Sequence, residues 1–289
     1  MPRPKTESVR WIYQSQETTK FSNVPELIML GHDRFHEASP LYDHRHEQCY
    51  EFVVVESGKV TWEVDGSLYA THTGQCFHTR PGEWHRARLN FIEPCSIWWI
   101  IVSDPAENPG WLGLHESDRL EFDCLLKQLP RVLQVDIRIR EKFASMRAIM
   151  TDNVQLASCR LRHHVLDILL QMLDPSSARS LPSDLIEALT RLTAEIEAAP
   201  EKRWTNKELA DRIGVSESHF YRLFQDMHGQ SPANYIDRLR MDHACRLLLQ
   251  PGSSITAVGM DLGYKTSQHF ATVFKKYTGL TPTQWRGFS

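Results

Sequence analysis

The chain has 289 residues, of which 41% are apolar and 24% charged, and its formal net charge is −3. This length suggests about two domains of roughly 150 residues each, and the composition excludes a mainly disordered or low-complexity chain. The longest apolar run, Ile97 to Val102, is shorter than the ~18 residues of a membrane span, and the polar start, Met1 to Arg10, leads into no apolar segment of a signal peptide. We therefore expect a cytoplasmic protein with no membrane partner, whose six widely spaced cysteines stay reduced.

Residues 20 to 103 predict short β-strands separated by turns. The expected strands are Leu27 to Leu30, Tyr50 to Val55, Lys59 to Val64, Leu68 to Thr71 and Cys95 to Val102. Asp65-Gly66 is a hairpin signal between two of them, and Arg80-Pro81-Gly82-Glu83 is typical of another turn. Many short strands at this spacing favour an all-β barrel or jelly roll, to which we assign residues 1–106.

Residue types that bind metals lie inside this region. They follow one another as His44-x-His46-x4-Glu51-x6-Gly58, then Gly74, then Pro81-Gly82-x2-His85. The pattern resembles the two motifs of cupin barrels, except that Pro81 stands one residue late and Leu89 replaces the usual asparagine. The resemblance implies a divalent metal held by three imidazoles and one carboxylate, those of His44, His46, His85 and Glu51.

Strand geometry adds a condition to this metal site. Glu51 is an odd number of residues after His46, so strict alternation would send their side chains to opposite faces. A turn or bulge near Glu47 to Cys49 is therefore required for the side chains to converge. If they do, the set suits zinc, iron, nickel or manganese. Two alternatives stay open: a pocket that binds an organic effector without metal, and a purely structural use of these residues.

Six of the eight tryptophans lie in the first 111 residues. Aromatic faces stack on flat ligands and sugar rings, although core packing is the commoner role of a tryptophan. Trp84 adjoins His85 and is the best pocket candidate. The predicted effector-binding residues are His44, His46, Glu51, Trp84 and His85.

The next segment, residues 107–174, is predicted to be helical. Apolar residues recur at helical intervals in Leu120 to Leu129 and in Arg138 to Leu173. These helices either pack on the barrel or pair two chains. We expect a homodimer, because a two-fold protein matched to two DNA half-sites gains affinity through effective concentration. Residues 175–184 are polar and predict a flexible linker.

An internal repeat gives the strongest signal in the chain. The first copy reads His219-Phe220-x3-Phe224-x4-Gly229-x-Ser231-Pro232-x2-Tyr235, and the second reads His269-Phe270-x3-Phe274-x4-Gly279-x-Thr281-Pro282-x2-Trp285. The offset is 50 residues throughout, so chance is a poor explanation. We interpret His219 and His269 as structural, because each adjoins a phenylalanine expected in the core.

Each copy predicts a helix, a short turn and a second helix. In the first copy, a capping box at Thr205-x-x-Glu208 opens a helix, Gly214 makes the turn, and Ser216 caps the second helix. In the second copy, Ser254 caps the first helix, Gly263 makes the turn, and the second helix begins near Thr266. Small residues four positions before each turn glycine, Ala210 and Gly259, allow the helices to approach closely. This is the helix-turn-helix pattern.

The helix between the two copies sets their separation. Ser231-Pro232 predicts its start and Pro251-Gly252 its end. Its nineteen residues, at ~1.5 Å each, span about 28 Å, close to the ~34 Å between successive major grooves of B-DNA. One chain is therefore expected to place two reading helices in adjacent grooves of double-stranded DNA.

Removing the core positions leaves the side chains expected to face DNA. They are Glu217, Ser218, Tyr221, Arg222, Gln225, Lys265, Ser267, Gln268, Thr272 and Lys275. Arg222 suits a guanine edge and Gln268 an adenine edge, whereas Lys275 suits a phosphate. A solvated surface is the alternative role of each residue. Residues 201–289 hold 12 Lys and Arg against 8 Asp and Glu, which agrees with a nucleic-acid partner.

At these motifs, residues 185–289 resemble the DNA-binding domain of AraC-type transcriptional regulators, notably in Gly263-Tyr264 and Gly279-x2-Pro282. The resemblance implies promoter binding that activates or represses transcription, with RNA polymerase as a further partner, under control of a variable effector domain. It makes a carbohydrate the first expectation for the effector. The fold class predicted is α+β, with an N-terminal cupin-like barrel, a helical segment and an all-α C-terminal domain carrying two helix-turn-helix motifs. We expect the protein to have no enzymatic activity; the alternative is a metal-dependent cupin enzyme or metal sensor fused to a DNA-binding domain.

Overall fold

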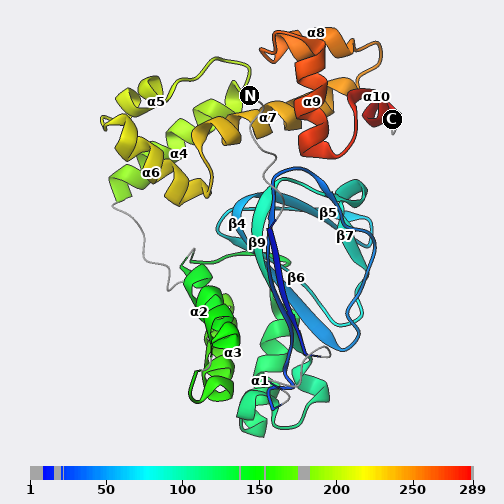
Figure 1. Cartoon of the computed structure of the whole chain (residues 1–289), viewed down its shortest axis with the longest axis vertical. Coiled ribbons are helices and arrows are strands. Elements are labelled where there is room, and N and C mark those ends of the chain that lie inside the picture. Colours follow the sequence, from blue (N-terminus) through cyan, green and yellow to red (C-terminus); the bar gives the residue numbers. More distant parts are fainter. Residues whose placement is uncertain are drawn as a thin grey trace. The chain divides into compact units, whose positions relative to one another are not determined.

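The chain forms two compact units in the computed structural model, which describes residues 9–15, 21, 23–136, 138–152, 154–174 and 183–287 (Figure 1). The first unit comprises residues 1–34, 41–90 and 95–178, and the second comprises residues 35–40, 91–94 and 179–289. Most of the predicted linker, residues 175–182, lies outside the described residues. No helix in the described part of the chain is long and apolar enough to cross a membrane.

A sheet of eight strands forms the body of the first unit, and its described pairings are antiparallel. The strands are β1 (Val9–Gln14), β2 (Leu27–Phe35), β4 (Cys49–Val64), β5 (Ser67–His72), β6 (Gln75–Thr79), β7 (His85–Ala87), β9 (Cys95–Ser103) and β10 (Val132–Gln134). Their order is β1-β2-β9-β4-β6-β10, with β5 and β7 also paired to β4. A separate ribbon pairs β3 (Ser39–Pro40) with β8 (Phe91–Ile92).

The two predicted strands Tyr50 to Val55 and Lys59 to Val64 are one long strand, β4. A register shift between Val55 and Ser57 interrupts its pairing with β9, and its two halves contact different neighbours. The hairpin signal is confirmed: Asp65 and Gly66 have φ of 49° and 76°, the left-handed conformations of a tight turn between β4 and β5. The register shift thus lets one strand pair with different neighbours along its two halves.

Three helices pack on one face of this sheet: α1 (Glu116–Gln128), α2 (Ile139–Thr151) and α3 (Ala157–Leu173). Their apolar side chains join Phe52, Val54 and Ile100 in one buried cluster, and the rings of Trp98 and Phe143 stack at 5.6 Å. The predicted helical stretch from Arg138 to Leu173 is therefore two helices. The buried residues of these helices contact the sheet. Pairing of two chains through the helices stays a prediction, and it would have to use the helix faces that point away from the sheet.

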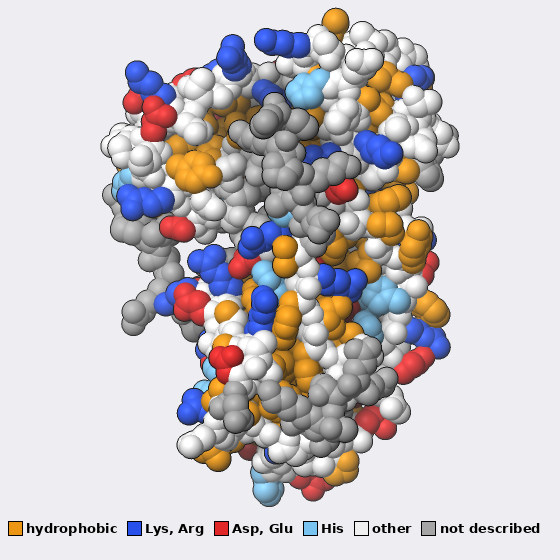
Figure 2. Space-filling view, viewed as in Figure 1, with side chains coloured by type: hydrophobic (Ala, Val, Ile, Leu, Met, Phe, Trp, Pro, Cys, Tyr) orange, Lys and Arg blue, Asp and Glu red, His pale blue; other side chains and the backbone are white. Residues whose placement is uncertain are grey.

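The opposite face of the sheet points into the unit. Side chains alternate along a strand, so Val53 and Trp99 point away from the helices that contact Phe52 and Trp98. Trp62 and Phe77 stack there with ring centroids 4.8 Å apart. On the face seen in Figure 2, hydrophobic side chains gather over the sheet between Lys and Arg side chains, and the edge strand β1 exposes Val9 and Ile12.

The second unit is mainly helical. Its helices are α4 (Ser183–Ala198), α5 (Asn206–Arg212), α6 (Glu217–His228), α7 (Pro232–Leu248), α8 (Ile255–Asp261), α9 (Ser267–Thr278) and α10 (Pro282–Arg286). Side chains of α4 to α7, including Phe220, Phe224 and Tyr235, form one hydrophobic core. Around the second copy of the repeat, Phe274 packs edge-on against Trp285, whose Nε1 donates to the Cys245 carbonyl at 3.1 Å.

The repeat is visible in the helix ends. Ser216 and Thr266 accept hydrogen bonds from the backbone N–H three residues later and so cap α6 and α9. Gly229 and Gly279 end these helices in the left-handed conformation, with φ of 66° and 77°. Ser231 and Thr281 cap the helices that follow. Because each cap is a local interaction, its sequence signal predicts the boundary well.

The turns inside the two motifs close in the same way. Gly214 and Gly263 have positive φ, and the N–H of the next residue bonds back to the Ala210 and Gly259 carbonyls at 3.1 and 3.0 Å. A Cβ on Gly259 would lie 3.0 Å from Cγ of Phe270, so the expectation that a small residue is needed there is confirmed.

Candidate functional site

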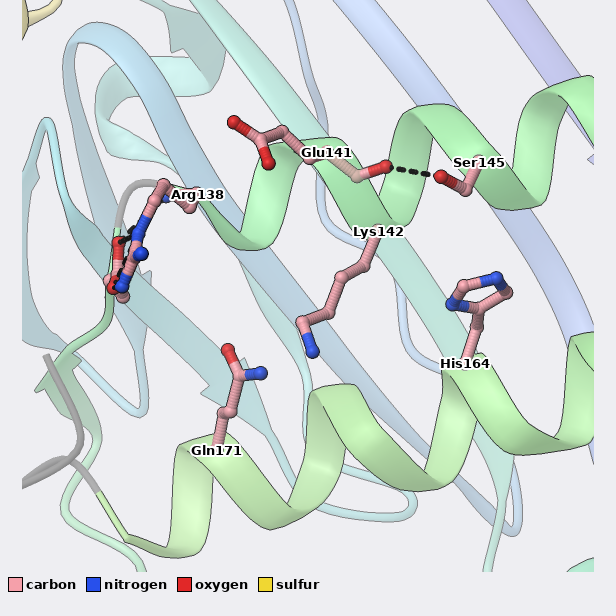
Figure 3. Close-up of a pocket in the computed structure, with 7 residues that line it drawn as sticks. Arg138, Glu141, Lys142, Ser145, His164 and Gln171 are labelled. Carbon is pink, nitrogen blue, oxygen red and sulfur yellow. Dashed lines mark hydrogen bonds and ion pairs between the residues drawn. The ribbon is translucent and has the colours of Figure 1, made fainter.

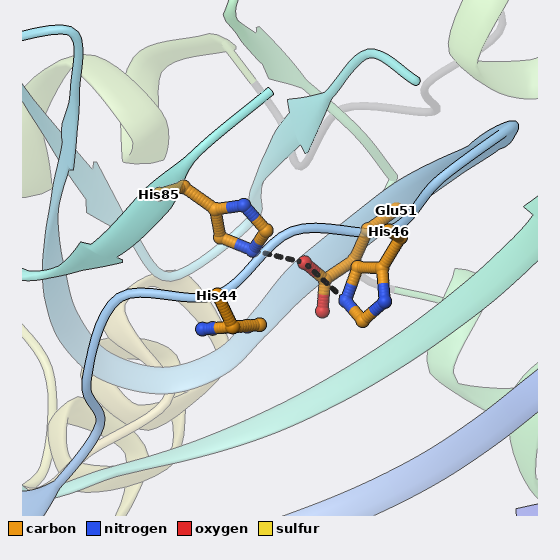
Figure 4. A group of neighbouring side chains, drawn as sticks. All are labelled: His44, His46, Glu51 and His85. Carbon is orange, nitrogen blue, oxygen red and sulfur yellow. Dashed lines mark ion pairs between the residues drawn. The ribbon is translucent and has the colours of Figure 1, made fainter. Parts of the chain in front are cut away.

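Four predicted metal ligands converge in the first unit. One ligand atom each from His44, His46, Glu51 and His85 lies within 4.8 Å of the others, and we name this group the histidine cluster (Figure 4). The Glu51 Oε2 atom lies 2.8 Å from His85 Nε2 and 3.7 Å from His46 Nε2. Glu51 and His85 are buried, and His44 and His46 are partly exposed.

Long-range pairing and one local turn bring these side chains together. His44 and His85 form an antiparallel bridge with two backbone hydrogen bonds of 3.0 Å. Gln48 has φ of 53°, so the chain turns between His46 and Glu51 before β4 begins. This is the turn that the spacing required, and it removes the conflict with strand alternation.

Hydrogen bonds to backbone carbonyls orient two of the imidazoles. The Nδ1 atoms of His44 and His85 lie 2.8 and 3.1 Å from the carbonyl oxygens of Tyr42 and Glu83. A carbonyl only accepts, so each Nδ1 carries the proton and donates it. The Nε2 atom of His85 then lies 2.8 Å from Glu51 Oε2, and a metal ion bound there would replace the proton that Nε2 donates to the carboxylate.

The electrostatics of the histidine cluster also fit a cation. Burial raises the pKa of Glu51, but the hydrogen bond from His85 and the three imidazoles lower it more, so the net pKa is below its ordinary value. Burial lowers the pKa of His46, which favours the neutral ring. The buried Nε2 of His46 has no hydrogen-bond partner among the described residues. An ionised carboxylate beside a neutral imidazole with a free lone pair is a suitable donor set for a divalent ion.

Trp84, the fifth predicted effector residue, lies apart from this group. It neighbours His85, and Arg45 neighbours His44, so alternation across the bridge puts both side chains on the other side from the two imidazoles. Trp84 is 51% exposed, and the Arg45 guanidinium lies 4.9 Å from its ring centroid. Its contact with an effector stays a prediction.

A polar pocket of about 520 Å³ lies between α2 and α3, and sequence reasoning did not find it (Figure 3). Lys142, His164 and Gln171 are among its lining residues. Its two cations already have partners, because Lys142 pairs with Asp167 and Arg138 pairs with Asp136. This neutralisation disfavours an anion site.

All ten predicted DNA contacts are exposed. They lie on α6, on α9 and in the turn before α9. Thr272 donates its hydroxyl to the Gln268 carbonyl at 2.9 Å, so part of its hydrogen-bonding capacity is used within α9. His219 and His269 are also exposed, so neither belongs to the core, and their place in the first turns of α6 and α9 makes them surface candidates that sequence reasoning missed.

Comparisons with known proteins match two separate stretches of the chain. Residues 36–101 match the family described as "Cupin domain", and residues 209–287 match "Helix-turn-helix domain". An uncharacterized HTH-type transcriptional regulator of Haemophilus influenzae is 36% identical, over 30% of this chain and 29% of that relative. The thermoregulatory protein LcrF of Yersinia pestis is 22% identical, over 83% of this chain and 90% of that relative. A crystal structure of an AraC-type transcriptional regulator from Chromobacterium violaceum is 28% identical, over 37% of this chain and 95% of that chain, with a TM-score of 0.34.

The chain thus joins a sheet-rich, cupin-like region to a helical domain with two helix-turn-helix motifs. In these two parts it resembles AraC-type transcriptional regulators with an N-terminal cupin-like domain. The predicted fold class and family resemblance are therefore confirmed.

Proposed function

We propose that this protein controls transcription by placing α6 and α9 in the major groove of promoter DNA. The observation that carries the proposal is the duplicated motif, with its exposed polar faces on α6 and α9 and the single helix α7 between the two copies. The 17 residues of α7, at ~1.5 Å each, span about 26 Å, which agrees with motifs that address successive major grooves.

Within this proposal, Arg222 on α6 and Gln268 on α9 read base edges. Arginine matches the two acceptors of guanine, and glutamine matches the donor and acceptor of adenine. Lys275 binds phosphate, and the other exposed residues predicted above line the same two faces. A homodimer on paired half-sites and contact with RNA polymerase complete the proposed mode of action.

Site selection from a random DNA library, with the full chain, tests the proposal. We expect a defined consensus whose two elements are about one helical turn apart. Arg222→Ala should cost about 1 to 3 kcal/mol on that site and relax one base position, and Gln268→Ala should relax a different one. Arg191→Ala is the matched control, because Arg191 is exposed on α4 outside both motifs. A library with no enriched site would refute promoter reading, and unchanged preferences in both variants would refute the assignment of these residues.

We further propose that the cupin-like domain receives the regulatory signal at the histidine cluster. The support is that four polar side chains converge there on one point, whereas Trp62, Phe77 and Trp99 fill other parts of the same sheet face. A small polar effector such as a carbohydrate would act only through a difference in its affinity for the DNA-competent and other states of the regulator.

A second candidate, a metal-dependent signal, has its own specific support. His44 and His85 are each held by a hydrogen bond to a backbone carbonyl, and His85 directs Nε2 toward Glu51; this preorganisation serves a cation more directly than it serves a sugar hydroxyl. His44, His46, Glu51 and His85 would hold zinc, iron, nickel or manganese. Such an ion would act as the signal itself or as the anchor for an organic ligand.

Metal analysis of protein purified without an affinity tag separates these possibilities. We expect stoichiometric metal in the unmodified chain and its loss in the double variant His44→Ala and His46→Ala. His163→Ala is the matched control, because His163 is exposed on α3. If the unmodified protein binds no divalent metal, the metal candidate fails. Promoter binding measured with sugars, metals and both together then identifies which ligand changes DNA affinity.

A further inference from the structure

We propose that Arg131, through its ion pair with Glu83, is a positioning residue for His85 and ties strand β10 to the histidine cluster. This inference rests on the proposed metal binding at that cluster. Arg131 lies outside both cupin motifs, and 48 positions separate it from Glu83 in the sequence.

The link begins in the turn Arg80–Glu83. The Glu83 N–H donates to the Arg80 carbonyl at 3.2 Å, and Gly82 at the third position has φ of 75°, as a type II turn with proline second requires. The Gly82 N–H donates to the His46 carbonyl at 2.9 Å, and the Glu83 carbonyl accepts from His85 Nδ1 at 3.1 Å. One turn therefore contacts two of the segments that carry the cluster's imidazoles.

Arg131 holds this turn from outside. Its guanidinium bonds both carboxylate oxygens of Glu83, with Nη1 to Oε2 at 2.6 Å and Nη2 to Oε1 at 2.9 Å. Nη1 also donates to the His78 carbonyl at 2.9 Å. The side chains of Arg131 and Glu83 are only 14% and 21% exposed, so water competes weakly for these bonds. A forked pair of this kind fixes direction as well as distance.

Strand β10 begins immediately after Arg131. Val132 pairs with Phe77 in β6, and β10 leads through Asp136 to α2. A displacement of the turn before His85 is therefore transmitted to the start of α2 through the side chains of Glu83 and Arg131 and through strand β10. By reciprocity, a ligand that orders the turn before His85 also favours the contact between Glu83 and Arg131.

Lysine cannot replace arginine fully in this role. Its ammonium is a point charge, so it retains attraction to Glu83 but loses the fork that sets the orientation of the turn. Outer-shell partners of metal ligands typically affect metal affinity by about 10- to 100-fold. Arg131 acts one step farther away, through Glu83, so we expect Arg131→Gln to weaken binding about 10-fold and Arg131→Lys to recover part of that loss.

Cobalt(II) titration of the full, tag-free chain, followed by visible absorption, tests the inference. Arg131→Gln should weaken Co²⁺ binding and change the shape of the absorption bands, because His85 is no longer held in one orientation. Arg138→Gln is the matched control, since its ion pair with Asp136 lies on the same connection but contacts no part of the turn. In the metal-free protein, ¹⁵N NMR of the imidazoles should show altered Nδ1 protonation of His85 in Arg131→Gln only.

The outcomes are distinguishable. If the unmodified chain binds no Co²⁺, the proposed metal site fails and this inference fails with it. If the unmodified chain binds Co²⁺ and Arg131→Gln matches it in affinity, band shape and His85 spectrum, the inference alone is refuted. Circular dichroism of the metal-free variant checks its fold. Should Arg131→Gln not fold, Glu83→Gln keeps the size of the side chain and serves the same comparison, with unchanged Co²⁺ binding again refuting the inference.

Discussion

Gly31 in β2 lies directly against the indole of Trp99, and this contact makes a quantitative prediction. A Cβ on Gly31 would lie 2.2 Å from both Cε2 and Cζ2 of Trp99. Carbon atoms in van der Waals contact are about 3.5 to 4.0 Å apart, so Gly31→Ala must displace the ring by more than ~1 Å. Trp99 is 7% exposed, and its Nε1 donates to the buried Asp33 carboxylate at 2.9 Å. The ring has little free space and a bond to lose.

The expected cost follows from those two facts. Overpacking a core costs about 1 to 3 kcal/mol, and a hydrogen bond to a charged group contributes about 1.5 to 3 kcal/mol. We therefore expect Gly31→Ala to destabilise the sheet by about 3 to 5 kcal/mol. Because the chain has two units and need not unfold in one step, native-state hydrogen exchange of peptides from β4 and β9 is the appropriate measurement.

A double-mutant cycle isolates the cause. Gly31 is not among the residues with positive φ, so alanine fits its backbone. In the Trp99→Leu background the obstructing ring atoms are gone, and Gly31→Ala should become neutral or stabilising by about 0.5 to 1 kcal/mol. An equal cost of Gly31→Ala in both backgrounds would refute the reasoning.

Three further predictions use the same kind of argument. His32 lies 3.1 Å from Glu56, and its hydrogen bond lowers the pKa of Glu56 to about 2 from an ordinary 4.5. Since this folded-state pKa lies below the ordinary value, the stabilisation of the fold by ionised Glu56 is present above pH 4.5 and is lost as the pH falls toward 2. Glu56→Gln should therefore flatten the plot of thermal stability against pH over that range. An unchanged slope would contradict this. Gly259→Val should cost about 2 kcal/mol through a clash with Phe270, whereas Gly259→Ala should be nearly neutral because helix propensity offsets the tighter contact; hydrogen exchange of α8 and α9 distinguishes the two. Ser216→Ala should lose about 1 kcal/mol by removing the cap of α6, measured by the same exchange, while Ser216→Thr should retain most of it.

Much of the C-terminal domain was predictable because its signals are local. Caps such as Ser231 and turn glycines such as Gly214 act within a few residues, so their positions gave the observed helix boundaries closely. The capping box at Thr205 was correct for the hydroxyl, which accepts from the Glu208 N–H, but the Glu208 carboxylate pairs with Lys202. Even here, tertiary neighbours decided where a long charged side chain goes.

The cupin-like region shows where sequence reasoning stops. The spacing of His44, His46, Glu51 and His85 named the cluster and required a turn, which Gln48 provides. By contrast, the sequence predicted two strands where β4 is one continuous strand. The apolar pattern is interrupted at the register shift as it would be at a loop, although the strand itself continues. Trp84 was grouped with His85 because they are neighbours in sequence, yet alternation separates neighbours onto opposite sides.

The sequence by itself determined the class of each domain, the repeat and the identity of the clustered side chains, since periodicity, caps and motif spacing are properties of short segments. Only the tertiary structure decided which distant segments meet. The bridge between His44 and His85 and the fork between Arg131 and Glu83 join residues 41 and 48 positions apart. Such contacts depend on strand register and packing of the whole sheet, and no local pattern encodes the distance between their atoms.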